Sequence, residues 1–207
     1  MSEKTESLFN AVYNAKTPED HKAAYGAWAS TYEDAIRESG YVSPPRVAAT
    51  LARHTADTSG PVLDVGCGTG LGGLALADAG FTAIDGIDLS PEMLAVAREK
   101  GVYRTLTAVN LLETVDIADD TYSGAYSTGT FTLGHIGPDR IPEVMRLLKP
   151  GAVFSLTVSE PSWIEKDYET VLASFVSDGI LNLLEDEVGD HVVNHNQQAH
   201  FLVLEKP

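Results

Sequence analysis

The sequence predicts an α/β fold in which a mostly parallel sheet carries helices on both faces. From residue 61 onward, short apolar runs alternate with stretches of helical spacing, and strands that alternate with helices imply a parallel sheet. A glycine-crowded turn joins the first of these runs to the first helix of the region. The last two apolar runs have no helix between them, so the sheet should close with an antiparallel hairpin.

The part of the chain before residue 61 is expected to be helical. Residues 18–39 have helical spacing, with three aromatic side chains on one face: Tyr25, Trp28 and Tyr32. Two prolines at positions 44 and 45 interrupt the region, and helical spacing resumes over residues 46–55. We therefore predict a single domain, 1–207, in which residues 1–58 form an N-terminal helical cap and residues 59–207 form the core.

Seven apolar runs in the core are predicted to be strands: 62–65, 83–88, 106–111, 124–128, 152–158, 180–184 and 199–204. Four stretches between them have helical patterns: 71–79, 91–101, 138–148 and 164–178. Gly80 ends the first of these helices, and Ser90 followed by proline is a typical helix start.

Composition excludes several classes of protein. The chain has 207 residues, of which 43% are hydrophobic and 21% charged, as is typical of one globular domain. No run reaches the roughly 18 continuous apolar residues that a membrane span needs, and residues 1–10 are polar rather than a signal segment. The single cysteine, Cys67, has no second cysteine for a disulfide or a metal site. We therefore expect a cytoplasmic protein with no membrane partner and no bound metal.

The net charge of −16 argues against a nucleic-acid substrate. It comes from 14 Lys and Arg residues against 30 Asp and Glu residues, a balance that repels a phosphate backbone. The densest basic runs, 98–100 and 146–149, lie late in helical patterns, where cations interact favourably with the helix dipole. A small-molecule substrate is the expectation that remains, and the sequence leaves the oligomeric state open.

An acidic residue precedes the glycine-crowded turn. Asp64 stands two residues before Gly66, and further glycines follow at positions 68 and 70. Missing side chains at alternate positions let the backbone approach a ligand closely, and the following helix N-terminus favours a carboxylate. The pyrophosphate of a dinucleotide would be repelled by Asp64, whereas a ligand with an ammonium or a sulfonium would be attracted. The turn therefore predicts a cofactor that carries positive charge.

The acid-x-Gly-x-Gly-x-Gly spacing resembles the first motif of the class I S-adenosylmethionine-dependent methyltransferases. The run Leu-Leu-Lys-Pro-Gly-Ala at 147–152 and the segment 25–33 also resemble this family, the latter matching a part that folds over the cofactor in small-molecule methyltransferases. Within that group, residues 127–131 with Gly134-His135 look most similar to the Williams-Beuren-region methyltransferase-like proteins. The resemblance implies a Rossmann-like, seven-stranded sheet with an antiparallel last strand, S-adenosylmethionine as cofactor and S-adenosylhomocysteine as product.

Further cofactor contacts are expected at the ends of the second, third and fourth strands. Asp88 lies twenty residues beyond Gly68, where a carboxylate can accept hydrogen bonds from ribose hydroxyls. The resemblance places adenine against Leu89 and Met93, although Met93 fits a core position equally well. Asn110 stands where many family members have an aspartate that binds the adenine amine; its carbonyl can accept the same bond, or the residue can simply form a turn. Backbone carbonyls after the fourth strand are expected to bind the methionine ammonium.

The predicted cofactor-binding residues are Tyr25, Tyr32, Asp64, Gly66, Cys67, Gly68, Gly70, Asp88, Leu89, Met93, Asn110, Leu111, Ser127 and Thr128. The predicted substrate walls are Trp28, Phe131 and Trp163. His135, in the loop after the fourth strand, is the candidate general base, because a histidine can take a proton near neutral pH; a histidine without a catalytic role at the start of a helix is the alternative. Three histidines near the closing hairpin are interpreted as surface residues: His191, His195 and His200.

The sequence therefore predicts an enzyme that transfers a methyl group from S-adenosylmethionine to an oxygen, nitrogen or sulfur nucleophile of a small molecule. Two alternatives stay open. Gly68, Gly70 and Gly73 by themselves match the Gly-x-Gly-x-x-Gly pattern of an NAD(P)-dependent oxidoreductase, in which Asp88 would bind the ribose. A catalytically silent protein that binds adenosylmethionine is the third possibility.

Overall fold

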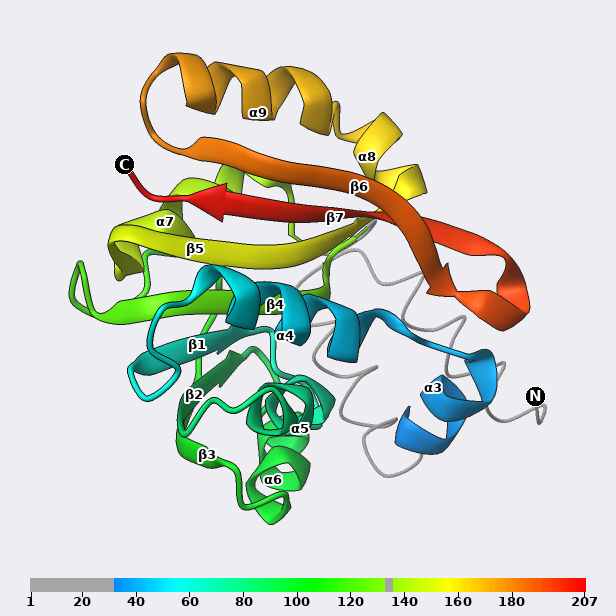
Figure 1. Cartoon of the computed structure of the whole chain (residues 1–207). Helices are drawn as coiled ribbons and strands as arrows, with labels where there is room; N and C mark the ends of the chain where they lie inside the picture. Colours follow the sequence, from blue (N-terminus) through cyan, green and yellow to red (C-terminus); the bar gives the residue numbers. More distant parts are fainter. Residues whose placement is uncertain (1–31, 133–135) are drawn as a thin grey trace.

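A seven-stranded sheet in the order β3-β2-β1-β4-β5-β7-β6 forms the centre of the molecule (Figure 1). The structure is a computed structural model that describes residues 32–132 and 136–207. The strands are β1 (Pro61–Val65), β2 (Ala83–Asp88), β3 (Tyr103–Ala108), β4 (Tyr122–Phe131), β5 (Leu148–Ser159), β6 (Asn182–Val192) and β7 (Gln197–Glu205). Strands β1 to β5 pair in parallel, and β7 runs antiparallel to both β5 and β6. This arrangement confirms the predicted mostly parallel sheet with a reversed last strand.

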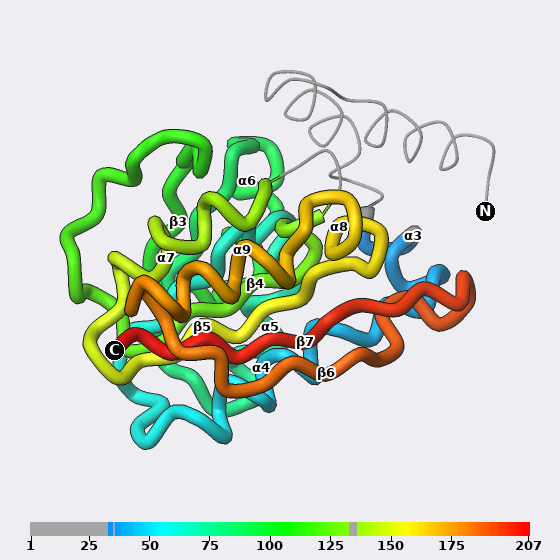
Figure 2. The backbone as a smooth tube through the Cα atoms, turned by 90° about the horizontal axis from the view of Figure 1, so that it is seen from above, coloured from blue at the N-terminus to red at the C-terminus, as the bar shows by residue number. Residues whose placement is uncertain are grey.

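The helices cover both faces of the sheet, as Figures 1 and 2 show. They are α3 (Tyr32–Ser39), α4 (Ser43–His54), α5 (Leu71–Asp78), α6 (Pro91–Glu99), α7 (Ile141–Leu147), α8 (Glu160–Glu165) and α9 (Tyr168–Ser177), with a 3-10 turn at Pro138–Arg140. Alternate residues of β1 serve the two layers: Val62 packs with Leu51 and Leu76 of α4 and α5, and Leu63 packs with Val144 and Leu172 of α7 and α9. Among the described residues, no helix is long and apolar enough to span a membrane.

The sheet order places a ligand crevice beside β1. The chain runs from β1 outward to β3 on one side, and then crosses to β4 and β5 on the other. In open parallel sheets, ligands bind outside the carboxyl ends of the strands where the order reverses in this way. The glycine turn 66–70 follows β1 at this point, so the fold brings the predicted site to the expected edge.

Several elements differ from their predicted bounds, and the physical reason is clear for three of them. Both prolines lie inside the first turn of α4 rather than before it, because the backbone N–H groups of a first turn have no helical partner and proline lacks one. Strand β3 lies earlier than 106–111, since its half-exposed, polar-rich sequence hides the pattern of an edge strand. The predicted helix 164–178 is broken into α8 and α9 at Asp167, which has a left-handed backbone with φ 48°.

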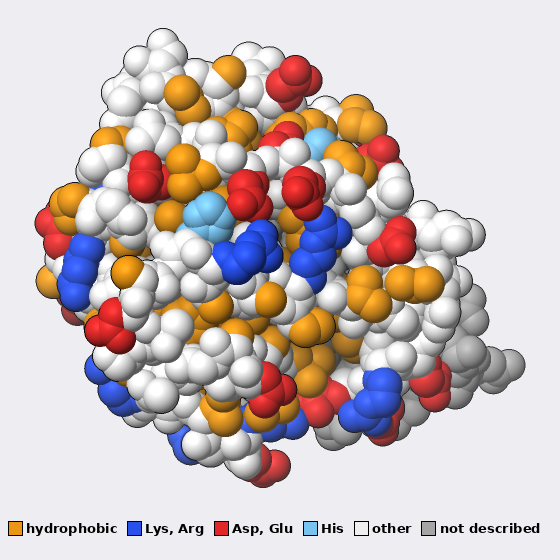
Figure 3. All heavy atoms as spheres, in the orientation of Figure 1, with side chains coloured by type: hydrophobic (Ala, Val, Ile, Leu, Met, Phe, Trp, Pro, Cys, Tyr) orange, Lys and Arg blue, Asp and Glu red, His pale blue; other side chains and the backbone are white. Residues whose placement is uncertain are grey.

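The edge strand β6 is much longer than the predicted run 180–184. Acidic residues break its apolar pattern, and they pair with basic residues of α4: Arg46 with Glu187 at 2.8 Å, and His54 with Glu185 at 2.7 Å. Figure 3 shows basic and acidic side chains side by side on this face of the molecule. Charged groups at a sheet edge oppose pairing with another strand, so these pairs both anchor α4 and protect the edge.

The expectation of an N-terminal helical cap concerns residues that lie mostly outside the described part of the chain. Helix α3 falls within the predicted segment 18–39, and α4 covers the predicted segment 46–55 except for its last residue, Thr55. Arg46 and Val47 of α4 contact β6 and the sheet core, so this helix is an integral part of the domain. The division of the chain at residue 58 stays a prediction.

Candidate functional site

The turn after β1 requires glycine at its alternate positions. Gly66, Gly68 and Gly70 have positive φ angles of 70°, 52° and 92°, which other residues adopt only with strain. At Gly66 a Cβ atom would overlap the side chain of Thr130 in β4. The turn is therefore shaped by backbone conformation and by the close approach of β4, and its backbone lines the crevice.

Asp64 is fully buried behind this turn. Its side chain lies under the first turn of α5, where a Cβ on Gly72 would stand 2.8 Å from Oδ2. The hydroxyl of Tyr103 in β3 donates a hydrogen bond of 2.6 Å to the same Oδ2. Burial raises the pKa of Asp64 to about 7, and the neighbouring Asp88 adds to this, while the Tyr103 hydrogen bond opposes it. The Asp64 carboxylate, which the sequence predicts beside the cofactor, is thus hydrogen-bonded to Tyr103. Sequence analysis did not identify this tyrosine.

Asp88 holds the two halves of the site together. Its Oδ2 accepts a hydrogen bond of 2.9 Å from the backbone N–H of Gly68, and its Oδ1 accepts one of 2.8 Å from Ser90. Ser90 in turn caps α6 by accepting a bond of 3.2 Å from the N–H of Met93, as predicted. Each carboxylate oxygen has a second lone pair, so Asp88 can bind a ribose while it keeps the turn in place.

The side chains of several predicted contacts point away from a ligand. Cys67 is buried against β2, where a Cβ on Gly86 would stand 2.9 Å from its Sγ, and burial raises the pKa of the thiol, so it stays neutral. Met93 is also buried, which favours its interpretation as a core residue. Leu111 belongs to the core cluster, and Leu89 is half-buried. Cys67 can therefore contact a ligand only through its backbone, which forms part of the glycine turn.

Asn110 forms the turn after β3. Its side-chain carbonyl accepts a hydrogen bond of 3.1 Å from the N–H of Leu112, and its amide donates one of 2.9 Å to Glu113. These bonds are those of the turn-forming alternative. The carbonyl keeps a second lone pair, so adenine recognition by Asn110 stays a prediction.

Hydroxyl groups at the end of β4 fix the end of β1. Ser127 donates a hydrogen bond of 2.8 Å to the carbonyl of Val65, and Thr130 donates one of 3.2 Å to the same oxygen. Thr128 contacts the hydroxyl of Tyr126 at 3.1 Å. Sequence analysis missed Thr130, because only its approach to Gly66 reveals its place at the site. The side chain of Ser127 is occupied, so its backbone carbonyl is the group that can face a ligand.

Two of the three predicted substrate-wall residues, Phe131 and Trp163, lie in the described part of the chain. One is a core residue, and the other lies at the carboxyl end of the sheet. Phe131 is fully buried and packs edge-to-face on Phe154, with ring centroids 5.8 Å apart, so it is a core residue and not a wall. Trp163 is half-buried in α8, directly after the carboxyl end of β5. It stacks on His200 at a centroid distance of 3.6 Å, and His200 contacts Asp186 at 2.7 Å.

The surface interpretation of the hairpin histidines is wrong for His191. This residue is 6% exposed, its Nδ1 lies 2.7 Å from the hydroxyl of Ser43, and burial lowers its pKa to about 4. His195 is exposed, as predicted. Three predicted site residues, Tyr25, Trp28 and His135, lie outside the described part of the chain, and Tyr32 is described only as the first residue of α3.

The donors and acceptors around the turn fit S-adenosylmethionine. Two carboxylates, the buried Asp64 and the half-buried Asp88, flank the backbone where a ligand with positive charge and ribose hydroxyls would lie. Helix α5 has Gly70 as its N-cap and no side-chain cap, so N–H groups of its first turn can donate hydrogen bonds to a ligand carboxylate. The hydroxyl of Thr69 in the same turn is buried without a hydrogen-bond partner among the described residues. The chemistry of the site therefore matches a cofactor that is both cationic and carboxylate-bearing.

The glycine at position 73 can be explained without a bound dinucleotide. A Cβ atom at this position would overlap the ring of Tyr103, so the residue is glycine because the tyrosine packs against α5. The match of Gly68, Gly70 and Gly73 to the dinucleotide pattern has this separate physical cause.

Comparison with known proteins agrees with the geometry. A methyltransferase domain family matches residues 62–151. Human methyltransferase-like protein 27 is 33% identical over 137 residues, which cover 64% of this chain and 55% of that protein. The 2-heptyl-1-hydroxyquinolin-4(1H)-one methyltransferase of Mycobacteroides abscessus is 27% identical over 176 residues, which cover 82% of this chain and 71% of that protein. The chain thus spans about half the length of the human relative.

A solved structure shares the whole architecture. The crystal structure of the [4+2]-cyclase SpnF superposes with a TM-score of 0.71 at 21% identity, and covers 93% of this chain and 97% of that chain. At this identity the likeness concerns the fold alone. The strand order, the acidic glycine turn and the methyltransferase domain matched at residues 62–151 all agree with a class I S-adenosylmethionine-dependent methyltransferase, in which S-adenosylmethionine is the cofactor.

Proposed function

We propose that the protein transfers the methyl group of S-adenosylmethionine to a nucleophile on a small molecule. The observation that carries this proposal is the pair of carboxylates, the buried Asp64 and the half-buried Asp88, on either side of a backbone turn whose positive φ angles favour glycine. When bound, the cofactor supplies a methyl group on a sulfonium; an acceptor lone pair takes the methyl carbon, and the broken bond's electrons return to sulfur in S-adenosylhomocysteine.

The contribution of the chain is mainly placement. Asp88 fixes the turn and the start of α6, and the hydroxyls of Ser127 and Thr130 fix the end of β1 against β4. Holding an acceptor about 3 to 3.5 Å from the reacting carbon can supply several kcal/mol without a covalent intermediate. A base is needed only for acceptors that carry a proton, and we propose His135 for this role.

For the acceptor we propose a small molecule bound against Trp163 at the carboxyl end of β5. The net charge of −16 disfavours nucleic acid. The name of the mycobacterial relative shows that it methylates a hydroxyquinolone, which is a small aromatic acceptor. The ring of Trp163 already stacks on His200 and on Tyr168, so an acceptor would contact the part of this side chain that stays exposed. The likeness to the Williams-Beuren-region methyltransferase-like proteins and a cytoplasmic location stay predictions.

Calorimetric titration with S-adenosylmethionine, S-adenosylhomocysteine, NAD and NADP in one buffer tests the cofactor assignment. We expect binding of the first two ligands and none of the dinucleotides. Binding of a dinucleotide alone would overturn the proposed function. Release of S-adenosylhomocysteine on incubation with pools of small metabolites would then separate an enzyme from a silent binding protein.

Replacing Asp88 by alanine is expected to weaken the affinity for S-adenosylmethionine by about tenfold or more, because two charge-assisted hydrogen bonds to ribose are worth roughly 1.5 to 3 kcal/mol. Calorimetry measures the change, and circular dichroism checks the fold, since Asp88 also holds the turn. The exposed Asp190 gives the matched control, Asp190→Ala, which should bind as the parent does. Unchanged affinity in folded Asp88→Ala protein would show that this carboxylate does not bind the ribose.

Replacing His135 by alanine should lower turnover by about 10²-fold, the lower end of what a general base contributes, with little effect on cofactor affinity. The measurement is the rate of S-adenosylhomocysteine formation at saturating acceptor. If cofactor affinity falls instead, His135 belongs to the cofactor site. If neither changes, the acceptor loses its proton to another group.

A further inference from the structure

Tyr103 occupies a slot that three glycines leave open. Its ring would be overlapped by a Cβ atom on Gly73 of α5, and lies 3.1 Å from the Cβ position of Gly70 and 3.0 Å from that of Gly86. These glycines come from the helix, the turn and the neighbouring strand. A residue in β3, outside the glycine motif, is thus packed at the centre of that motif.

The hydroxyl of Tyr103 makes two hydrogen bonds with fixed directions. The backbone N–H of Gly73 donates to it at 3.0 Å, so the hydroxyl is an acceptor there. Its own proton is donated to Oδ2 of Asp64 at 2.6 Å. A donor at this distance stabilises the ionised carboxylate, because the hydrogen bond is stronger to a charged acceptor than to a neutral one.

We propose that Tyr103 is a positioning residue for the cofactor, which keeps Asp64 ionised beneath α5 and so sets the lower pH limit of cofactor binding. The inference rests on the proposed function, since it assumes that the cationic cofactor is attracted by the Asp64 charge. Tyr103 touches no ligand in this account and acts only through Asp64.

The groups around Asp64 support this assignment. Burial raises the pKa of Asp64 to about 7, and repulsion from Asp88 raises it further, whereas Tyr103 is the group that lowers it. The thiol of Cys67 stays neutral, since burial and both aspartates raise its pKa. Lys100, whose side chain lies 3.1 Å from the Cβ position of Gly70, is paired with Glu33 of α3 at 2.7 Å. The Tyr103 hydrogen bond thus opposes the effect of burial on the pKa of Asp64, which lies near neutral pH.

The direction in which pH changes the cofactor affinity follows from these opposing effects on the pKa of Asp64. Cofactor affinity should fall as the pH drops through about 7, because protonation removes the charge of Asp64. In Tyr103→Phe, loss of a hydrogen bond to a charged group should weaken the acid about tenfold. At pH 7 the ionised fraction would then drop from about one half to about one tenth, so affinity should fall about fivefold, and by less than about twofold at pH 9.

The experiment is calorimetric titration of the full chain with S-adenosylmethionine at pH 6, 7, 8 and 9, for the parent protein and Tyr103→Phe. Phenylalanine keeps the ring that fills the glycine slot. The matched control is Tyr122→Phe, which removes a tyrosine hydroxyl bound to a different carboxylate, Oδ2 of Asp85 at 3.2 Å. The control should follow the parent at every pH. A Tyr103→Phe curve that superposes on the parent curve would overturn the inference while the proposed function stands.

Two outcomes separate the inference from its foundation. If the parent protein does not bind S-adenosylmethionine at any pH, the proposed function fails and the inference fails with it. If Tyr103→Phe does not fold, Asp64→Asn carries the test, because asparagine keeps the size of the side chain without a titrating charge. Its affinity should be weak and nearly independent of pH. A persistent loss of affinity at acid pH in Asp64→Asn would show that another group titrates, and would overturn the role assigned to Tyr103.

Discussion

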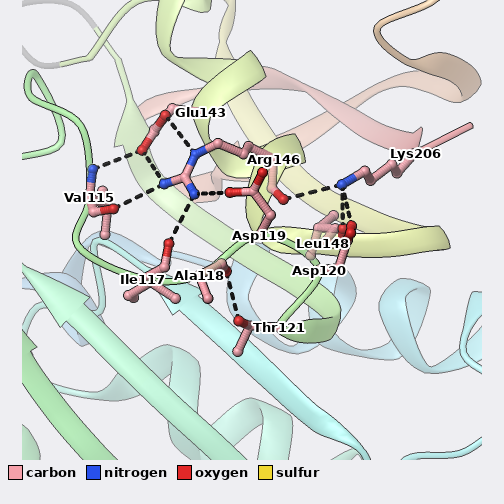
Figure 4. A network of polar contacts seen from close by, with 10 residues as sticks. All are labelled: Val115, Ile117, Ala118, Asp119, Asp120, Thr121, Glu143, Arg146, Leu148 and Lys206. Carbon is pink, nitrogen blue, oxygen red and sulfur yellow. Dashed lines mark hydrogen bonds and ion pairs between the residues drawn. The ribbon is translucent and has the colours of Figure 1, made fainter.

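Replacing Arg146 by methionine is expected to lower the free energy of unfolding by about 2 to 4 kcal/mol, because the change leaves two carboxylates and two backbone carbonyls without their charged donor. Figure 4 shows the guanidinium at the centre of a polar network. It donates to the carbonyls of Val115 and Ile117, each at 2.9 Å, to Glu143 at 2.7 Å and to Asp119. These contacts fasten the loop between β3 and β4 to the last turn of α7.

Urea unfolding at neutral pH measures the effect. Arg37→Met provides the matched control, because Arg37 pairs with Asp34 on the surface of α3, where both side chains are more than 70% exposed. An exposed pair of this kind contributes about 0 to 1 kcal/mol. If Arg146→Met costs no more stability than Arg37→Met, the network does not anchor the loop.

The effect should also depend on pH in a defined direction. The hydrogen bond from Arg146 lowers the pKa of Glu143, so this carboxylate contributes stability that is present at neutral pH and lost as the pH falls through its folded-state pKa. In Arg146→Met that acid-sensitive contribution should be smaller. The sequence explains the basic residues at 146–149 as charges that favour the C-terminal end of a helix. That explanation fits the position of Arg146 in α7, but it does not predict the hydrogen bonds of Arg146 to the loop between β3 and β4.

Local signals predicted the centre of the fold well. Strand β1, the glycine turn and the Ser90 cap follow from residues that are neighbours in sequence, and the structure has them within one residue of their predicted bounds. The physical reason is that burial, backbone conformation and capping at these positions are each decided by a few adjacent residues.

Contacts between distant residues could not be predicted in the same way. Tyr103 reaches Asp64 across 39 positions, and only the packing of β3 beside β2 brings its ring under α5. His191 lies in an exposed edge strand by its sequence, yet it is buried because Ser43 and Tyr41 pack against it. Phe131 ends a strand at the ligand edge, but its side chain faces the core. Side-chain direction at the end of a strand depends on its neighbours, which a single sequence does not show.

Replacing Asp64 by asparagine is expected to make the protein more stable above neutral pH and a poorer binder of its cofactor. Burial raises the pKa of Asp64 in the folded protein to about 7, well above the ordinary aspartate value of 3.8 that applies to an unfolded chain. The unfolded state therefore loses its proton first, and folding stability falls as the pH rises from about 4 to about 7. Above that range the folded protein carries a buried charge, which should cost about 2 to 4 kcal/mol.

Urea unfolding at pH 4, 6 and 8 tests the linkage. Asp64→Asn should gain about 2 to 4 kcal/mol over the parent at pH 8, gain less at pH 6 and differ little at pH 4. Asp190→Asn, at an exposed position of β6, should stay within about 0.5 kcal/mol of the parent throughout. A loss of stability in Asp64→Asn at pH 8 would mean that the folded protein prefers the ionised carboxylate, and that its pKa is not raised.

The same variant should bind S-adenosylmethionine about tenfold more weakly at pH 8, because the attraction of a buried charge for the cationic cofactor is lost. Both results would have one cause, the ionised carboxylate of Asp64. In the free protein it is a buried charge without a cationic partner, which lowers the stability of the fold. In the complex the same charge attracts the cationic cofactor and stabilises binding. Cofactor binding would then relieve the cost of the buried charge. The Tyr103 hydroxyl limits that cost before the cofactor arrives, since it is the donor that Asp64 retains in the free protein.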